Sequence, residues 1–188
     1  MDFEKYLSKC NGEEKNYNAK ILYPITEEIV RIWCNRKCSE YKDLGRPSLY
    51  ENNKYIHKTF DFTFEKNGKF YIGEQKNWIA VENGAYINEI YLYNKDIEYL
   101  RGAINNKYKV YCNGKKWHIS GVILVWPHPS DKFIKEFKKE NPKFEILSFQ
   151  KMVNDLIKEK NKEYLLLIKN HKEYCEKLFK ELLPKNKV

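Results

Sequence analysis

Hydrophobic and polar positions alternate along two segments on either side of Asn67-Gly68, and this pattern predicts a β-hairpin. Residues 55–64 and 69–77 are rich in the aromatic and β-branched residues that favour strands. Asn-Gly is typical of a two-residue type I′ turn, because both central residues of that turn need a positive φ. Such a turn also sets the register of the hairpin, and here it places Asp61 directly opposite Glu74.

The same alternation divides the side chains of the predicted hairpin between two faces. Glu74 and Lys76 fall on the face that also carries Thr59 and Asp61. We expect the other face to belong to the core, because it carries aromatic side chains: Phe60, Phe62, Phe64 and Tyr71. Two carboxylates directly across a ladder repel each other, so this pair would destabilise the hairpin unless another group offsets the repulsion.

A divalent cation between Asp61 and Glu74 would remove this repulsion, since Mg²⁺ prefers carboxylate oxygens and keeps several waters. Lys76, two residues beyond Glu74, could then orient a metal-bound water or stabilise charge on a phosphate. The alternative is a solvated polar face on an ordinary hairpin, because charged residues at alternate strand positions are common.

The rest of the chain alternates between helical and extended patterns. A helix is predicted at 26–38, where Thr26 is the N-cap and the buried stripe contains Ile25, Ile29, Ile32 and Trp33. The other predicted elements are a short helix at 2–10, a loop at 39–54 with a short strand near 48–50, a segment at 86–105 that is mainly helix but ambiguous with strand at 86–92, a turn at 112–114, a buried central strand at 117–126, a helix at 130–140 capped by Ser130, a strand at 144–149, and helices at 150–183 with a break near 160–162.

This order predicts an α/β fold with a central mixed sheet, built around the hairpin and flanked by helices. We divide the chain into an α/β core at 1–149 and a helical extension at 150–188. We expect the extension to pack on the core, and the alternative is that its helices pair with a second copy in a homodimer.

Thr59-Phe60-Asp61 followed by Glu74-Gln75-Lys76 resembles the PD-(D/E)xK nuclease superfamily, whose members have the restriction-endonuclease-like fold. The continuation through Asn77 and Trp78 is similar to the nuclease-related (NERD) branch of that superfamily. The sequence departs from the motif in having Phe60 where the motif has Pro. The specific match covers about twenty residues, and the order of predicted elements extends the resemblance to most of the chain.

The resemblance implies a metal-dependent endonuclease that hydrolyses DNA phosphodiester bonds. Asp61, Glu74 and the backbone carbonyl of Gln75 would hold Mg²⁺, with Mn²⁺ as a substitute, and Lys76 would complete the catalytic set. Residues outside this set are also implied: Glu28 as an accessory acid from the preceding helix, and Arg46, Asn77 and Trp78 as nucleic-acid contacts. For Glu28 the alternative role is stabilisation of the helix dipole at a helix start.

Composition is compatible with this function without requiring it. Lys and Arg number 35 against 26 Asp and Glu, and a net charge of +9 suits an anionic partner such as nucleic acid or a membrane surface. A lysine-rich composition without functional meaning is the alternative. No apolar run is long enough to span a membrane and the start has no signal-peptide core, so we expect a soluble, cytoplasmic protein.

The five cysteines are odd in number and scattered, which predicts reduced thiols. Cys34, Cys38, Cys112 and Cys175 could in principle hold an iron–sulfur cluster, although their spacing does not require it. The sequence contains no Gly-rich phosphate loop, no Ser or Cys nucleophile signature and no Cys/His zinc pattern. Besides a nuclease, two hypotheses remain: a nucleic-acid-binding module that does not cut, and a lysine-rich interaction protein unrelated to nucleic acids.

Overall fold

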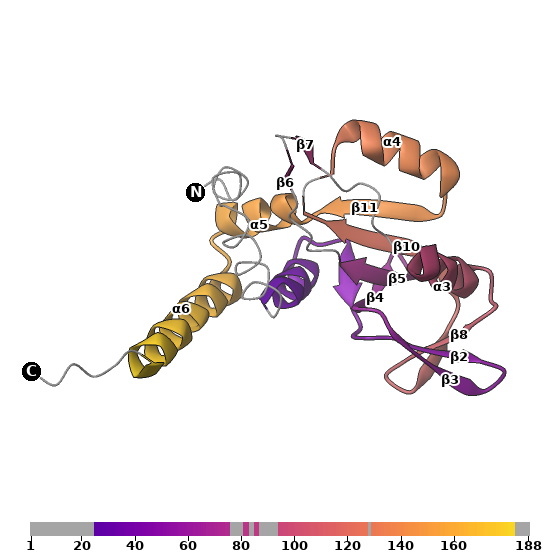
Figure 1. The fold of residues 1–188 in the computed structure, drawn as a ribbon, viewed down its shortest axis with the longest axis horizontal. Coiled ribbons are helices and arrows are strands. Elements are labelled where there is room, and N and C mark those ends of the chain that lie inside the picture. The colour runs from indigo at the N-terminus through magenta and orange to yellow at the C-terminus, as the bar shows by residue number, and fades with distance from the viewer. Residues whose placement is uncertain (1–24, 76–80, 83–84, 87–93, 128, 183–188) are drawn as a thin grey trace, which may run out of the picture.

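A five-stranded mixed sheet forms the centre of the computed structural model, which describes residues 25–75, 81–82, 85–86, 94–127 and 129–182 (Figure 1). Its strands, in spatial order, are β1 (Tyr41–Asp43), β4 (Phe62–Lys66), β5 (Lys69–Gln75), β10 (Ile119–Trp126) and β11 (Phe144–Ser148). β4 runs antiparallel to both of its neighbours, β1 and β5, whereas β5, β10 and β11 run parallel to one another. The chain is therefore an α/β protein with a mixed sheet, as the sequence predicts.

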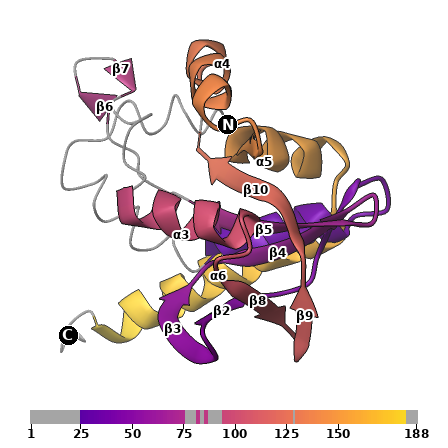
Figure 2. The same cartoon turned by 90° about the vertical axis from the view of Figure 1, so that its right-hand side faces the viewer.

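Helices cover both faces of this sheet. On one face lie α3 (Asn94–Ile104) and α4 (Asp131–Glu140), and Figure 2 shows α3 crossing the sheet. On the other face lie the helix at 25–35 and α5 (Phe149–Lys158). Because both faces are covered, β10 is buried along most of its length, in agreement with its nearly continuous apolar sequence.

A second, four-stranded antiparallel sheet extends from the core at the end opposite the C-terminal helix (Figure 1). Its strands, in spatial order, are β3 (Lys54–Thr59), β2 (Ser48–Glu51), β8 (Lys109–Cys112) and β9 (Lys115–Trp117). A small ladder joins β6 (Val81–Glu82) to β7 (Ala85–Tyr86).

The predicted hairpin and its register are confirmed over β4 and β5, but the ladder ends at Phe62 and does not include the predicted pair of Asp61 with Glu74. Strands β4 and β5 pair antiparallel across Asn67-Gly68, with Phe64 opposite Tyr71 and Phe62 opposite Gly73. Both turn residues have positive φ, 51° for Asn67 and 73° for Gly68, as a type I′ turn requires.

The prediction of one continuous strand at 55–64 is wrong. The chain breaks at Phe60-Asp61, so β3 belongs to the four-stranded sheet and β4 to the five-stranded sheet. The break also changes the face of Phe60, which packs with Ile72, whereas Phe62 packs on the opposite face of the sheet. Both phenylalanines are fully buried, so the bend lets one chain segment fill two cores.

The strand predicted at 117–126 is also divided, because Trp117 ends β9 of the four-stranded sheet and β10 begins at Ile119. The remaining predicted elements agree with the structure in kind and differ at their ends. The helix predicted at 26–38 spans 25–35, and the helix within 86–105 begins at Asn94, while 87–93 and the helix predicted at 2–10 lie outside the described residues. Ser130 caps α4 as expected, because its hydroxyl accepts a hydrogen bond from the Phe133 N–H. Strand β1 was not predicted from the loop at 39–54.

The C-terminal extension divides into two parts. Helix α5 packs its Met152 and Leu156 side chains into the core, and the break near 160–162 separates it from α6 (Lys162–Leu182). Early in α6, Tyr164 and Leu167 contact the same core. The remainder of α6 extends away from the core (Figure 1) and exposes large apolar side chains: Leu165, Leu166, Ile168, Tyr174, Leu178, Phe179 and Leu182. Among the helices that the structure describes, none is long and apolar enough to cross a lipid bilayer.

The hairpin depends on the absence of a side chain at Gly73. A Cβ built there would lie 2.4 Å from the Phe64 ring and 2.9 Å from the Phe62 Cβ. We therefore expect Gly73→Ala to lower the free energy of unfolding by about 3 kcal/mol, near the upper end of overpacking costs, measured by urea denaturation.

Gly68→Ala is the matched control, because a Cβ there would meet no atom within 4 Å and the cost arises only from the positive φ of 73°. We expect this control to lose about 1 kcal/mol. Equal losses for the two variants would contradict close packing of the hairpin against the phenylalanines.

Candidate functional site

Asp61 lies at the bend between β3 and β4, where its carboxylate is held against the backbone of β5. Its Oδ2 accepts a hydrogen bond of 2.8 Å from the backbone N–H of Gln75. The bend takes Asp61 out of the ladder. The Asp61 side chain therefore accepts the hydrogen bond from the Gln75 N–H that a backbone carbonyl of the neighbouring strand would otherwise accept. The carboxylate of Asp61 is therefore fixed beside the residue that follows Glu74.

Glu74 is on β5, with Leu124 of β10 as its partner, and is only 6% exposed. It shares a face of the sheet with the apolar core that contains Ile72. A carboxylate is rarely buried in such surroundings unless it is paired with a cation or a metal. Its Oε1 lies 4.0 Å from the Nζ of Lys58.

Lys58 and Asp96 extend the site beyond the residues that the sequence motif identifies. The Lys58 Nζ lies 2.8 Å from Oδ1 of Asp96, a residue in the first turn of α3 that is 9% exposed. The same ammonium is 4.9 Å from the centroid of the Phe60 ring. Lys58 therefore joins acids from two elements, β5 and α3, at one place on the sheet.

The helix at 25–35 supports Asp61 through Arg31. Its Nη2 donates a 3.2 Å hydrogen bond to the backbone carbonyl of Asp61, and its guanidinium also pairs with Asp43 of β1. Glu27 joins this network through ion pairs with Arg31, at 3.9 Å, and with Arg46. The bend at Asp61 is thus held in place by charge pairs from a neighbouring helix.

The resemblance implies Glu28 as the accessory acid, but in the structure its neighbour Glu27 is the residue that faces the network around Asp61. Glu28 is exposed, whereas the Glu27 side chain is 13% exposed and belongs to the network around Asp61. Arg46, expected to contact nucleic acid, has a side chain 53% exposed and pairs with Glu27. Neighbouring side chains on a helix point about 100° apart, so Glu27 faces the network around Asp61 while Glu28 faces solvent.

Three of the motif residues lie outside the described part of the chain: Lys76, Asn77 and Trp78. Among the residues that the structure does describe, no group of three His, Cys, Asp or Glu side chains is close enough to form a ready metal site. Asp61 and Glu74 are the two carboxylates of the motif that the structure describes, and Lys76 follows Glu74 by two residues in the sequence.

The four described cysteines do not form one group, although the exposed Cys38 is only four residues from Cys34. Cys34 is buried in the helix at 25–35, Cys112 is buried at the end of β8, and Cys175 is on α6. Burial raises the pKa of both the Cys34 and the Cys112 thiols, so both stay protonated at neutral pH. The Cys112 thiol donates to the carbonyl of Leu44 at 3.1 Å. Their separation gives no support to the possible four-cysteine cluster.

We expect Lys58→Met to destabilise the protein by about 2 kcal/mol at neutral pH, measured by urea denaturation. Removing the ammonium leaves the carboxylates of Glu74 and Asp96 close together and largely buried, and the side chain of Lys58 is 24% exposed, which reduces the cost from that of a fully buried pair.

Lys172→Met is the matched control, because Lys172 forms an ion pair of 3.8 Å with Glu176 on α6 while its side chain is 74% exposed. Its loss should stay within about 0.5 kcal/mol. A loss at Lys58 no larger than the loss at Lys172 would show that the ammonium does not hold the two acids.

Comparison of the chain with protein-family models, with curated proteins and with solved structures gave no match.

Proposed function

We propose that this protein is a metal-dependent nuclease that hydrolyses DNA phosphodiester bonds at Asp61, Glu74 and Lys76. The observation that carries the proposal is the hydrogen bond of 2.8 Å from the Gln75 N–H to the Asp61 carboxylate. It ties the acid at the bend to the strand that carries Glu-x-Lys. The contact joins the two parts of the motif, Asp61 and the strand that carries Glu74.

The donor set fits a hard divalent cation. Asp61 and Glu74 offer carboxylate oxygens and Gln75 offers a backbone carbonyl, and such oxygen ligands are preferred by Mg²⁺ and Mn²⁺. When bound, the cation would supply Lewis acidity and a water of lowered pKa. Burying the Glu74 carboxylate beside an apolar core costs free energy, and a bound cation would offset this cost.

The remaining groups have distinct roles in this proposal. Lys76 holds the attacking water or neutralises charge on the phosphate, as the resemblance implies. Lys58 holds Glu74 and Asp96 in place from the other side, because its Nζ contacts both acids. Arg31 fixes the backbone of Asp61 and so keeps the carboxylate of that residue aimed at β5.

The order of elements also supports the proposal. A helix at 25–35 precedes β1, the β4–β5 hairpin, α3, β10, α4 and β11. Three antiparallel strands followed by a helical crossover to a parallel strand agree with the order expected for a restriction-endonuclease-like core. The four-stranded sheet is additional to that order.

We expect the purified protein to cut DNA with Mg²⁺ or Mn²⁺ and not in excess chelator. Asp61→Ala, Glu74→Gln and Lys76→Ala should each reduce the rate at least about 100-fold, because each removes a ligand or charge needed in the transition state. The measurement is the initial rate of cleavage of a fluorescently labelled DNA.

Glu140→Ala is the control for the acidic variants, because Glu140 is exposed at the end of α4, and it should cut like the wild type. Equal cleavage by the wild type and all three site variants would exclude the assignment. DNA binding that persists in chelator, without cleavage under any divalent ion, would instead support the non-cutting binding module.

We also propose that the exposed stripe of α6 pairs with a second copy of the chain. Ile168, Cys175, Phe179 and Leu182 recur at intervals of seven, four and three residues, which places them on one side of the helix. Ile168 is 38% exposed, Phe179 45% and Leu182 68%, while Cys175 is partly buried.

We expect light scattering after gel filtration to show a dimer, and a Leu178→Glu/Phe179→Glu variant to be monomeric. Lys177→Glu, an exposed position on the opposite side of the same helix, should remain dimeric. A wild-type protein that is monomeric at the concentrations used for cleavage would contradict this pairing.

A further inference from the structure

The four-stranded sheet carries three tyrosines on its outer face. Tyr50 of β2 pairs directly with Tyr55 of β3, and the register places Tyr111 of β8 on the same face. The opposite side chains, such as Leu49 and Val110, are buried in the core. We call Tyr50, Tyr55 and Tyr111 the tyrosine face.

The rings of the tyrosine face lie close together while remaining accessible. The ring centroid of Tyr50 is 5.5 Å from that of Tyr55 and 5.2 Å from that of Tyr111. Tyr55 is 41% exposed, and the other two are partly exposed. Neighbouring rings restrain one another, so the face presents apolar surface to solvent in a fixed arrangement.

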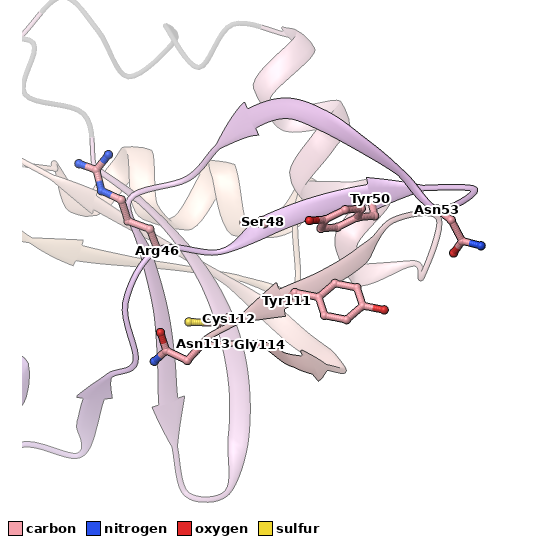
Figure 3. Close-up of a pocket in the computed structure, with 8 residues that line it drawn as sticks. All are labelled: Arg46, Ser48, Tyr50, Asn53, Tyr111, Cys112, Asn113 and Gly114. Carbon is pink, nitrogen blue, oxygen red and sulfur yellow. The ribbon is translucent and has the colours of Figure 1, made fainter.

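An open hollow of about 390 Å³ adjoins these rings, and Figure 3 shows Tyr50 and Tyr111 extending from neighbouring strands along it. Polar groups that can donate and accept hydrogen bonds line the rest of it, among them Ser48, Asn53 and Asn113. Its volume is within the range of about 300–1,000 Å³ that is common for sites of small organic groups.

Positive charge surrounds the tyrosine face. Lys109 pairs with Tyr50 across the ladder, and Lys116 pairs with Tyr111, so both lysines belong to the outer face. The Lys109 Nζ is held by a 2.7 Å hydrogen bond to Asn53 Oδ1 at the rim of the hollow. The four described strands contain one acidic residue, Glu51, whose carboxylate lies 3.8 Å from the Nζ of Lys107.

We propose that the tyrosine face binds single-stranded nucleic acid by stacking unpaired bases on its rings, with Lys109 and Lys116 contacting the phosphates. Aromatic rings flanked by cations are the chemistry that recognises this ligand, because each base offers a π-face and each nucleotide a negative charge. A duplex is excluded from stacking, since its bases are already stacked on one another. The inference deepens the proposed function, on which it rests for the assumption that nucleic acid is the substrate.

The face is also connected to the cleavage site through β3. Tyr55 points to the outer face, while Lys58, on the same strand, reaches Glu74, and Asp61 follows the end of the strand. Six residues of extended chain span at most about 20 Å. A bound single-stranded nucleic acid of a few nucleotides would therefore be long enough to reach from the tyrosine face to the two carboxylates.

The test is binding in chelator, where cleavage cannot occur, of labelled oligonucleotides of about 12 nucleotides, a length that such folds cover. Fluorescence anisotropy would compare single-stranded DNA, single-stranded RNA, a duplex and an abasic strand of equal length. We expect the wild type to bind at least one intact single strand roughly ten-fold more tightly than the abasic strand or the duplex, and the DNA and RNA arms to identify the preferred sugar.

Tyr50→Ala/Tyr111→Ala should remove that preference and bind the intact strand like the abasic one, whereas Tyr50→Phe/Tyr111→Phe should retain it. Tyr174→Ala, which changes an exposed tyrosine on α6, is the matched control and should bind like the wild type. Lys109→Ala/Lys116→Ala should weaken intact and abasic strands alike and lower the salt dependence of binding.

Equal affinity of the wild type for intact and abasic strands would overturn the inference, and this comparison does not depend on how any variant folds. Unchanged preference in the alanine pair would overturn it as well. Asp61→Ala should bind like the wild type, so loss of cleavage and loss of stacking are separate outcomes. A protein that cuts duplex DNA but shows no preference for intact single strands would keep the proposed function and reject the tyrosine face.

Discussion

The contact between the Asp61 carboxylate and the Gln75 backbone N–H is the constraint on which the candidate site depends. It closes the open end of a hairpin whose other end is closed by the Asn67-Gly68 turn. With both ends held, the strand pair has one register, and a slip of one residue would move every side chain to the opposite face. Glu74 can therefore stay beside the core only in this register.

The bend at Phe60-Asp61 has a second consequence, because it lets one stretch of chain serve two sheets. Before the bend, β3 contributes Tyr55 to the outer tyrosine face and Lys58 to the acids of the core. After the bend, β4 contributes Phe62 to the core on the other side of the sheet. The candidate cleavage site thus lies where the two sheets meet, and the same segment would position both the acids and the bound strand.

Charge is arranged differently at these two places. Near Asp61 and Glu74, Arg31 forms an ion pair with Asp43, and Lys58 lies beside Glu74. Positive and negative side chains are therefore balanced at this site, and a divalent cation would add to the positive charge. On the four-stranded sheet, lysines outnumber acids and stand beside aromatic rings. Part of the excess of positive charge over the chain is thus on the four-stranded sheet, where we propose that nucleic acid binds.

Local sequence determined the features that need only neighbouring residues. Asn67-Gly68 requires a reversal because both residues take positive φ, the apolar run at β10 requires burial on both faces, and Ser130 begins α4 because its hydroxyl replaces a missing backbone acceptor. A further signal of this kind was present at Asn52-Asn53, whose positive φ values of 49° and 65° turn β2 into β3. The pairing of Asp61 with the strand of Glu74 followed from the turn and from counting along two strands.

Only the tertiary structure decided where the extended segment before Asp61 breaks and which sheet each half joins. That choice depends on β2, which pairs with β3 on one side and with β8, about sixty residues later, on the other. Long-range pairing of this kind leaves no periodic signal in the segment itself. The sequence therefore could not show which face of the sheet Phe60 occupies, or that Lys58 and Asp96 belong to the site. Asp61 and Glu74 could be related from the sequence because a turn sets the register of their two segments, whereas Lys58 could not be related to Glu74, because it reaches that residue from another sheet.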